Sequence, residues 1–250
     1  LNALGNPWDI TGEDNSGYGK IIATRGSSRW QASEGPEVIY RDGYYYLFLA
    51  YGSLSVEYNT RVCRSRNIDG PYVDIHGNSA MGSAQLYPIL TAPYRFDNSY
   101  GWVGISHCGI FDDGAGNWFY TSQGRFPVNV GGNEYSNAIM MGHVRSIRWD
   151  ANGWPLVMPE RYGAVPQAPI TENEIAGDWE HLALTNSTGT QRTSETMTYD
   201  LDTHKITSGS WKNATWTFDA ATQTITTSAG VVLYLQREVD WEASPRTHTI

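Results

Sequence analysis

Lysine is nearly absent from this chain of 250 residues: only Lys20, Lys205 and Lys212 occur, and the formal net charge is −9. A protein that binds a nucleic-acid duplex needs a basic face to neutralise phosphates, so nucleic acid is not expected as a partner. No apolar run approaches the roughly 20 residues that span a bilayer, so no membrane partner is expected either. The apolar content of 40% suffices for a packed core and excludes a disordered tail.

Cysteine is equally scarce, with only Cys63 and Cys108. Two cysteines cannot form a disulfide framework. The sequence leaves open a single bridge in an exporting context and a pair of small buried thiols.

Helical periodicity is also weak, whereas glycine and aromatic residues are abundant: 26 Gly, 16 Tyr, 10 Trp and 6 Phe. Short alternating or aromatic runs between Gly, Asn and Asp turns predict an all-β protein. Aromatic rings with few lysines suit a neutral, polyhydroxylated ligand such as a sugar. A tyrosine-rich β-protein without a sugar ligand has the same composition.

A strand order recurs along the first part of the chain. The first unit predicts a strand, a tight turn, a strand buried on both faces, and a third strand after a long loop: residues 37–40, 41–43, 44–51 and 60–66. The second unit repeats this order at residues 108–111, 112–116, 117–122 and 138–149. Aligning Tyr44 with Trp118 gives an offset of 74 residues. The matched order favours propeller blades over a sandwich of independent hairpins.

The repeat places Glu34 and His107 at equivalent strand starts, where both would point at the central axis. Glu34 precedes Gly35-Pro36, a rigid turn that can hold a carboxyl at a cleft. If aromatic rings such as Trp30 surround Glu34, desolvation raises the pKa of its carboxyl, and Glu34 could then act as a general acid near neutral pH. The alternative is an ordinary surface glutamate before a strand.

The second axial residue, His107, stands alone, because no His, Cys or Asp partner lies at zinc-ligand spacing. A buried histidine satisfied by a carbonyl is the alternative to a functional one. The adjacent Cys108 would point to the opposite face of the strand. Tyr58 and Arg125 lie in loops beside these strands and could bind sugar hydroxyls or brace the loops. The sequence has no glycine-rich phosphate loop before a helix and no Gly-x-Ser-x-Gly elbow.

A linker with Pro166 and Pro169 divides the chain. We expect a partial propeller over residues 1–165 and a small β-sandwich or barrel over residues 166–250. The second domain has Thr-rich strands predicted at 193–199, 215–218, 222–227 and 231–236, and no titratable cluster is expected there.

Several motifs together resemble an arabinanase of glycoside hydrolase family 43. They are Glu34-Gly35-Pro36, residues 43–48, 61–65 and 68–72, His107, Arg125-Phe126-Pro127, and the stretch from Gly153-Trp154-Pro155 to residue 162. The resemblance covers about Gly17 to Tyr162. The second domain resembles the ancillary β-domain of two-domain endo-arabinanases.

The resemblance implies a secreted, five-bladed propeller that cleaves α-1,5-linked arabinofuranosyl bonds in plant cell wall arabinan with inversion. Such enzymes use an Asp base, an orienting Asp and a Glu acid, and Glu34 matches the acid. Inversion needs carboxyls roughly 6.5–9.5 Å apart. His107 matches an axial histidine that lies close to a calcium ion, with water molecules completing the coordination of the ion. Tyr58 matches a tyrosine near the scissile bond, and Arg125 is expected to contact substrate.

Two departures from the family pattern stand out. Cys108 occupies a position where the family has a small polar residue, and the two Asp motifs belong to blades that would precede Leu1. Asp9, Asp14 and Asp42 do not sit in those motifs. We therefore expect a C-terminal portion, inactive alone and completed by an N-terminal segment or a second polypeptide. A sister arabinofuranosidase or xylosidase and a non-catalytic carbohydrate-binding module remain alternatives, and endo or exo action stays open.

Overall fold

The computed structural model describes residues 20–25, 33–82, 85–96 and 99–250. In that part of the chain all regular structure is β, apart from two single-turn 3-10 helices, η1 (Ser136–Ala138) and η2 (Glu172–Glu174). None of its helices is long and apolar enough to cross a membrane. The predicted all-β class is therefore confirmed.

The first sheet is a four-stranded antiparallel meander. Its strands, in spatial order, are β1 (Glu34–Arg41), β2 (Tyr44–Tyr51), β3 (Asn59–Ser65) and β4 (Ile89–Thr91). Asp42 and Gly43 join β1 to β2 with φ of 49° and 81°, the left-handed pair that a two-residue hairpin turn requires. Six consecutive residues of β2, from Tyr46 to Tyr51, are buried, as predicted for a strand covered on both faces.

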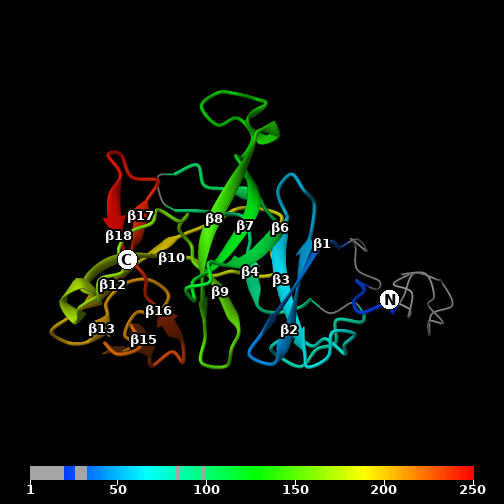
Figure 1. Ribbon diagram of the computed structural model, residues 1–250. Coiled ribbons are helices and arrows are strands. Elements are labelled where there is room, and N and C mark those ends of the chain that lie inside the picture. The colour runs from blue at the N-terminus through cyan, green and yellow to red at the C-terminus, as the bar shows by residue number, and fades with distance from the viewer. Residues whose placement is uncertain (1–19, 26–32, 83–84, 97–98) are drawn as a thin grey trace.

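The second sheet repeats the first. Its strands are β6 (Val103–Asp112), β7 (Trp118–Arg125), β8 (Met140–Trp149) and β9 (Pro155–Val157), again in sequential antiparallel order. β2 and β7 begin at Tyr44 and Trp118, the two residues that the predicted 74-residue offset aligns. The two sheets stand side by side in Figure 1, one blue to cyan and one green. Four-stranded antiparallel sheets repeated in this way are propeller blades; the count of five blades remains a prediction.

The seam between the two sheets is a hydrophobic core. It is formed by Tyr46, Phe48, Val62, Leu90, Cys108, Ile110, Tyr120, Ile147 and Trp154. Cys63 belongs to a different cluster, which includes Leu47, Leu49 and Tyr72. Both cysteines are free and buried, which decides between the two possibilities left by the sequence.

The C-terminal part has its own core and three small sheets. The strands are β10 (Gly177–His181), β12 (Glu195–Asp200), β13 (Lys205–Ile206), β14 (Trp216–Asp219), β15 (Thr224–Thr227), β16 (Val232–Tyr234), β17 (Glu238–Asp240) and β18 (Thr247–Thr249). Trp216 lies at the centre of its core and is 1% exposed. A parallel pair, β5 (Tyr94–Arg95) with β11 (Arg192–Thr193), ties it to the chain between the propeller sheets. The sandwich or barrel and the division at residue 165 remain predictions.

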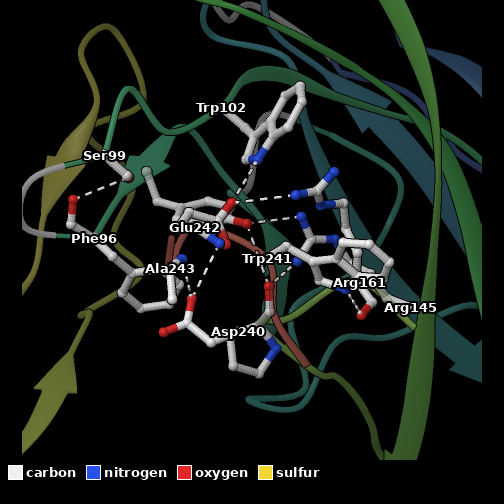
Figure 2. A network of polar contacts seen from close by, with 11 residues as sticks. Phe96, Ser99, Trp102, Arg145, Arg161, Asp240, Trp241, Glu242 and Ala243 are labelled. Atoms are coloured by element: carbon white, nitrogen blue, oxygen red, sulfur yellow. Dashed lines mark hydrogen bonds and ion pairs between the residues drawn. The ribbon is translucent and has the colours of Figure 1, made fainter. Parts of the chain in front are cut away.

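The second domain contributes two carboxylates, Asp240 and Glu242, to a titratable cluster that the sequence analysis did not anticipate. Glu160, Asp240 and Glu242, hereafter the carboxylate cluster, bring carboxylate oxygens within 4.8 Å of one another. Glu242 also accepts a hydrogen bond from Trp102 Nε1 at 3.3 Å and pairs with Arg161 at 3.5 Å (Figure 2). The sequence hides the cluster because β17 brings Asp240 and Glu242 back to a residue some 80 positions earlier.

Candidate active site

Glu34, Tyr58 and His107 meet at one end of the seam between the sheets. The Tyr58 hydroxyl donates a hydrogen bond to Glu34 Oε1 and lies 3.1 Å from His107 Nδ1. Glu34 begins β1, Tyr58 directly precedes β3, and His107 lies in β6. Tyr58 is only 1% exposed. The structure therefore brings three of the four predicted site residues into one hydrogen-bonded chain.

His107 does not open its strand, contrary to the prediction of equivalent strand starts. It is the fifth residue of β6, because that strand begins at Val103. The β6–β7 register shifts twice, between Val103 and Ser106 and again between Ser106 and Gly109. Each bulge inserts an unpaired residue and turns the strand. His107 sits in the second bulge with a φ of 60°, a left-handed conformation that is uncommon outside glycine.

The hydrogen bonds define the protonation of the histidine ring. A tyrosine hydroxyl carries one proton, and Tyr58 gives it to Glu34. Its contact with His107 must then be an accepted hydrogen bond, so Nδ1 of His107 carries the ring proton. In the neutral ring, Nε2 keeps its lone pair and is available to water or a cation.

Burial and the hydrogen bond to Glu34 hold the pKa of Tyr58 well above its usual value. Tyr58 thus stays protonated and remains a donor at any physiological pH. Burial likewise raises the pKa of the Cys108 thiol to about 12. Cys108 packs in the core on the opposite face from His107, as predicted, and offers no thiolate to a metal.

Arg125, the fourth predicted site residue, braces a loop. Its Nη1 donates to the carbonyl oxygen of Asn137 at 2.9 Å, across the connection from β7 to β8. Its aliphatic part lies against Gly104. Its Nε is buried without a hydrogen-bond partner in the described part of the chain. Trp30, expected to wall Glu34, lies outside the described residues.

The donors around His107 do not by themselves form a calcium site. Calcium prefers six to eight oxygen ligands, and His107 offers one nitrogen. Among the described residues, the one group of three or more potential metal ligands is the carboxylate cluster, which excludes His107. The calcium ion expected near His107 stays a prediction.

Gly35 is fitted closely to His107. Its φ is +55°, and a Cβ added there would lie 3.0 Å from His107 Cδ2. We expect Gly35→Ala to cost about 1–2 kcal/mol for the left-handed backbone and, in addition, to push the imidazole away from Tyr58. Gly77→Ala is the matched control, since Gly77 has a φ of +80° and no neighbour within 4 Å of an added Cβ. Thermal unfolding of both variants would measure the excess cost, and an equal loss would contradict the steric fit.

The sequence did not reveal that Tyr58 joins Glu34 to His107, nor the buried hydroxyl groups behind the β6 bulges. Threonine and serine are ordinary strand residues, and nothing in their spacing marks them. One local signal was present in the sequence: a glycine inside a strand often marks a bulge, and Gly104, whose φ is 63°, lies three residues before His107.

Comparison with known proteins gives a consistent result. The sequence profile of glycosyl hydrolases family 43 matches residues 5–155, and that of a C-terminal lipocalin-like domain found with this family matches residues 159–250. An extracellular endo-α-(1→5)-L-arabinanase 2 from Bacillus subtilis (strain 168) is 30% identical over 186 residues, 66% of this chain and 38% of that protein. An extracellular endo-α-(1→5)-L-arabinanase from Thermotoga petrophila is 30% identical over 185 residues, 66% of this chain and 37% of that protein.

Solved structures agree on the fold. A family 43 glycoside hydrolase from Bacillus licheniformis matches with a TM-score of 0.76 at 24% identity over 93% of this chain and 54% of that one. An endo-1,5-α-L-arabinanase from Thermotoga petrophila matches with a TM-score of 0.74 at 24% identity over the same shares. The chain spans about 38% of the length of the curated arabinanases it matches. Since the family profile covers more than half of its residues, this chain belongs to glycosyl hydrolases family 43.

Proposed function

We propose that this chain supplies the general acid of an inverting endo-arabinanase that cleaves α-1,5-linked arabinofuranosyl bonds. The observation that carries the proposal is the hydrogen bond from Tyr58 to Glu34 Oε1, made by a buried tyrosine that also contacts His107. This chain of groups fixes one carboxylate oxygen in place. A carboxyl held in this way is suited to acid catalysis, which depends on geometry first.

In the proposed step, Oε1 of Glu34 is held by Tyr58, and Oε2 carries the proton. That proton passes to the glycosidic oxygen as its bond to the anomeric carbon breaks. A water molecule, activated by a carboxylate outside the described residues, bonds to the anomeric carbon from the opposite face and gives its proton to that base. The products are a shortened arabinan chain of inverted configuration and a free sugar hydroxyl.

The proposal extends to substrate, partner and location. Both arabinanase relatives are named as extracellular enzymes, which supports arabinan or arabino-oligosaccharides as substrate and secretion as location. The remaining propeller blades, supplied by a preceding segment or a second polypeptide, would hold the other two carboxylates. Arg125 would act on the substrate by fixing the β7–β8 connection through the carbonyl oxygen of Asn137. Calcium near His107 would use the free Nε2 and water ligands.

Removing the Tyr58 hydroxyl tests the arrangement. In the completed enzyme we expect Tyr58→Phe to lower kcat on linear arabinan about 10- to 100-fold, because Glu34 becomes a carboxylate as its proton leaves and a hydrogen bond to a charged group contributes about 1.5–3 kcal/mol. KM should change little. Tyr46→Phe is the control: Tyr46 is also 1% exposed and also donates one hydrogen bond, to the Gly153 carbonyl, away from Glu34. An equal loss of kcat in both variants would reduce the role of Tyr58 to packing.

A further inference from the structure

The two bulges that place His107 are stabilised by side chains of neighbouring strands. The Thr91 hydroxyl donates to the carbonyl oxygen of Ile105 at 2.7 Å, and Thr121 donates to that of Gly109 at 3.0 Å. Inserted bulge residues are left without ladder partners, and a buried carbonyl without a partner is costly. These side chains therefore supply hydrogen bonds to carbonyl groups of the bulged segment, as a neighbouring strand does for a regular one.

Behind the bulges lies a chain of four hydroxyls, hereafter the hydroxyl network: Ser106, Thr60, Tyr120 and Thr91. Thr60 Oγ1 is 2.7 Å from Ser106 Oγ and 2.7 Å from the Tyr120 hydroxyl. The Tyr120 hydroxyl is in turn 3.2 Å from Thr91 Oγ1. The four residues come from β3, β4, β6 and β7, so the network crosses the seam between the two sheets.

The network is shielded from solvent and directional. Thr60, Ser106 and Tyr120 are fully buried, and Thr91 is nearly so. Thr91 gives its one proton to Ile105, so it must accept its other contacts, one of which comes from the Thr60 backbone N–H at 3.2 Å. Hydrogen bonds in a low-dielectric seam hold their partners firmly, and losing one member leaves another unsatisfied.

The fixed groups immediately precede His107 in the chain. Ile105 is held by its carbonyl and Ser106 by its hydroxyl, which leaves the backbone little freedom at the next residue. A left-handed φ, such as that of His107, is unfavourable at a non-glycine residue. Such a conformation persists only where the surroundings enforce it.

We propose that Thr60 and Thr91 are positioning residues, which lock the β6 bulge through the hydroxyl network and so hold His107 against Tyr58. The proposal deepens the proposed function and rests on it for its catalytic meaning. It concerns residues that touch neither substrate nor the reacting atoms. Their effect is exerted through the backbone of Ile105 and Ser106.

The test uses the whole chain with isotope-labelled histidine. Thr60→Val keeps the shape of the side chain and removes the hydroxyl, whereas Thr60→Ser keeps the hydroxyl. In the native chain and in Thr60→Ser, the His107 ring should show NMR cross-relaxation with the Gly35 α-protons, since the two residues are packed together. In Thr60→Val these cross-peaks should fall at least threefold. Tyr120→Phe, which removes another hydroxyl of the network, is the second variant and should weaken them as well.

Thr224→Val is the control for general destabilisation. Thr224 is buried in the C-terminal part and has a hydroxyl partner, Thr222, at 2.8 Å, remote from β6. Its His107 cross-peaks should match those of the native chain. Unchanged cross-peaks in Thr60→Val and Tyr120→Phe, or an equal loss in Thr224→Val, would overturn the positioning role. If the cross-peaks respond as expected while a completed enzyme leaves arabinan intact, the proposed function fails and the positioning role stands.

Discussion

Replacing Glu34 by glutamine is expected to lower arabinan hydrolysis by a completed enzyme about 10²- to 10⁴-fold, the usual contribution of a positioned general acid. The amide of Glu34→Gln can still accept the hydrogen bond from Tyr58, so the local structure should survive. It has no proton to give to the glycosidic oxygen. Release of reducing ends from linear arabinan measures the effect. Purified residues 1–250 alone should release none, because the chain would hold one of three required carboxylates.

The leaving group distinguishes an acid from any other carboxylate. An aryl arabinoside with an acidic phenol releases a phenolate, which needs no proton from the enzyme in order to leave. Glu34→Gln should therefore lose far less activity on this substrate than on arabinan. Asp42→Asn is the control, since Asp42 is an exposed carboxylate in the turn at the other end of the same strand. An equal loss on both substrates would remove the acid role from Glu34. Hydrolysis by residues 1–250 alone would overturn the need for further blades.

Unchanged affinity for arabino-oligosaccharides in Glu34→Gln, together with lost turnover, would support a catalytic cleft. A carbohydrate-binding module would bind the oligosaccharides and show no turnover even when completed by the remaining blades. The product profile of the active enzyme would separate an endo-arabinanase from an arabinofuranosidase or xylosidase. NMR of the first-formed anomer would test inversion.

The carboxylate cluster is expected to make stability depend on pH. Burial, and then the neighbouring carboxylate of Glu242, raise the pKa of Glu160 to about 8. Unfolded, Glu160 would release its proton near its ordinary value of 4.5. The folded chain retains the proton up to about pH 8, so this group contributes its full stability below pH 4.5. The contribution falls as pH rises from 4.5 to 8 and changes no further above that.

Four charged residues act on Glu160: Glu242, Arg145, Asp240 and Arg161. The hydroxyl of Tyr94 faces the same cluster, and His143 lies beside the two arginines. Burial, and then Arg145 and Arg161, lower the pKa of His143 to about 3, so this residue stays neutral across the window. The three carboxyls of the cluster then lie near two guanidinium groups, Arg145 and Arg161, and one retained proton balances the charges.

Glu160→Gln should remove this dependence of the free energy of unfolding on pH. Its free energy of unfolding should equal that of the native chain near pH 4 and exceed it by on the order of 5 kcal/mol at pH 8.5, at about 1.4 kcal/mol per unit of pKa over the rise from 4.5 to about 8. Urea titrations at a series of pH values measure this difference. Glu134→Gln, at an exposed glutamate in the connection from β7 to β8, should track the native chain throughout. A constant difference between Glu160→Gln and the native chain would exclude a titrating Glu160.

The strands and their repeat could be predicted because both are local. The Asp42-Gly43 turn, the buried run of β2 and the matching start of β7 all follow from residue types within a few positions of one another. Family membership could be predicted for a related reason, since short motifs such as Glu34-Gly35-Pro36 keep their spacing. The roles of Glu34, Tyr58, Arg125 and His107 remain predictions that the experiments above would test.

What the sequence by itself determined is therefore the all-β class, the blade repeat and the family. The tertiary structure alone decided which groups touch: the chain from His107 through Tyr58 to Glu34, the hydroxyl network across four strands, and the meeting of Glu160 with Glu242. Turns and alternation are set by neighbouring residues, whereas these contacts depend on strand register and on two bulges in β6. A shift of one residue in register turns every side chain to the other face, and nothing local in the sequence records it.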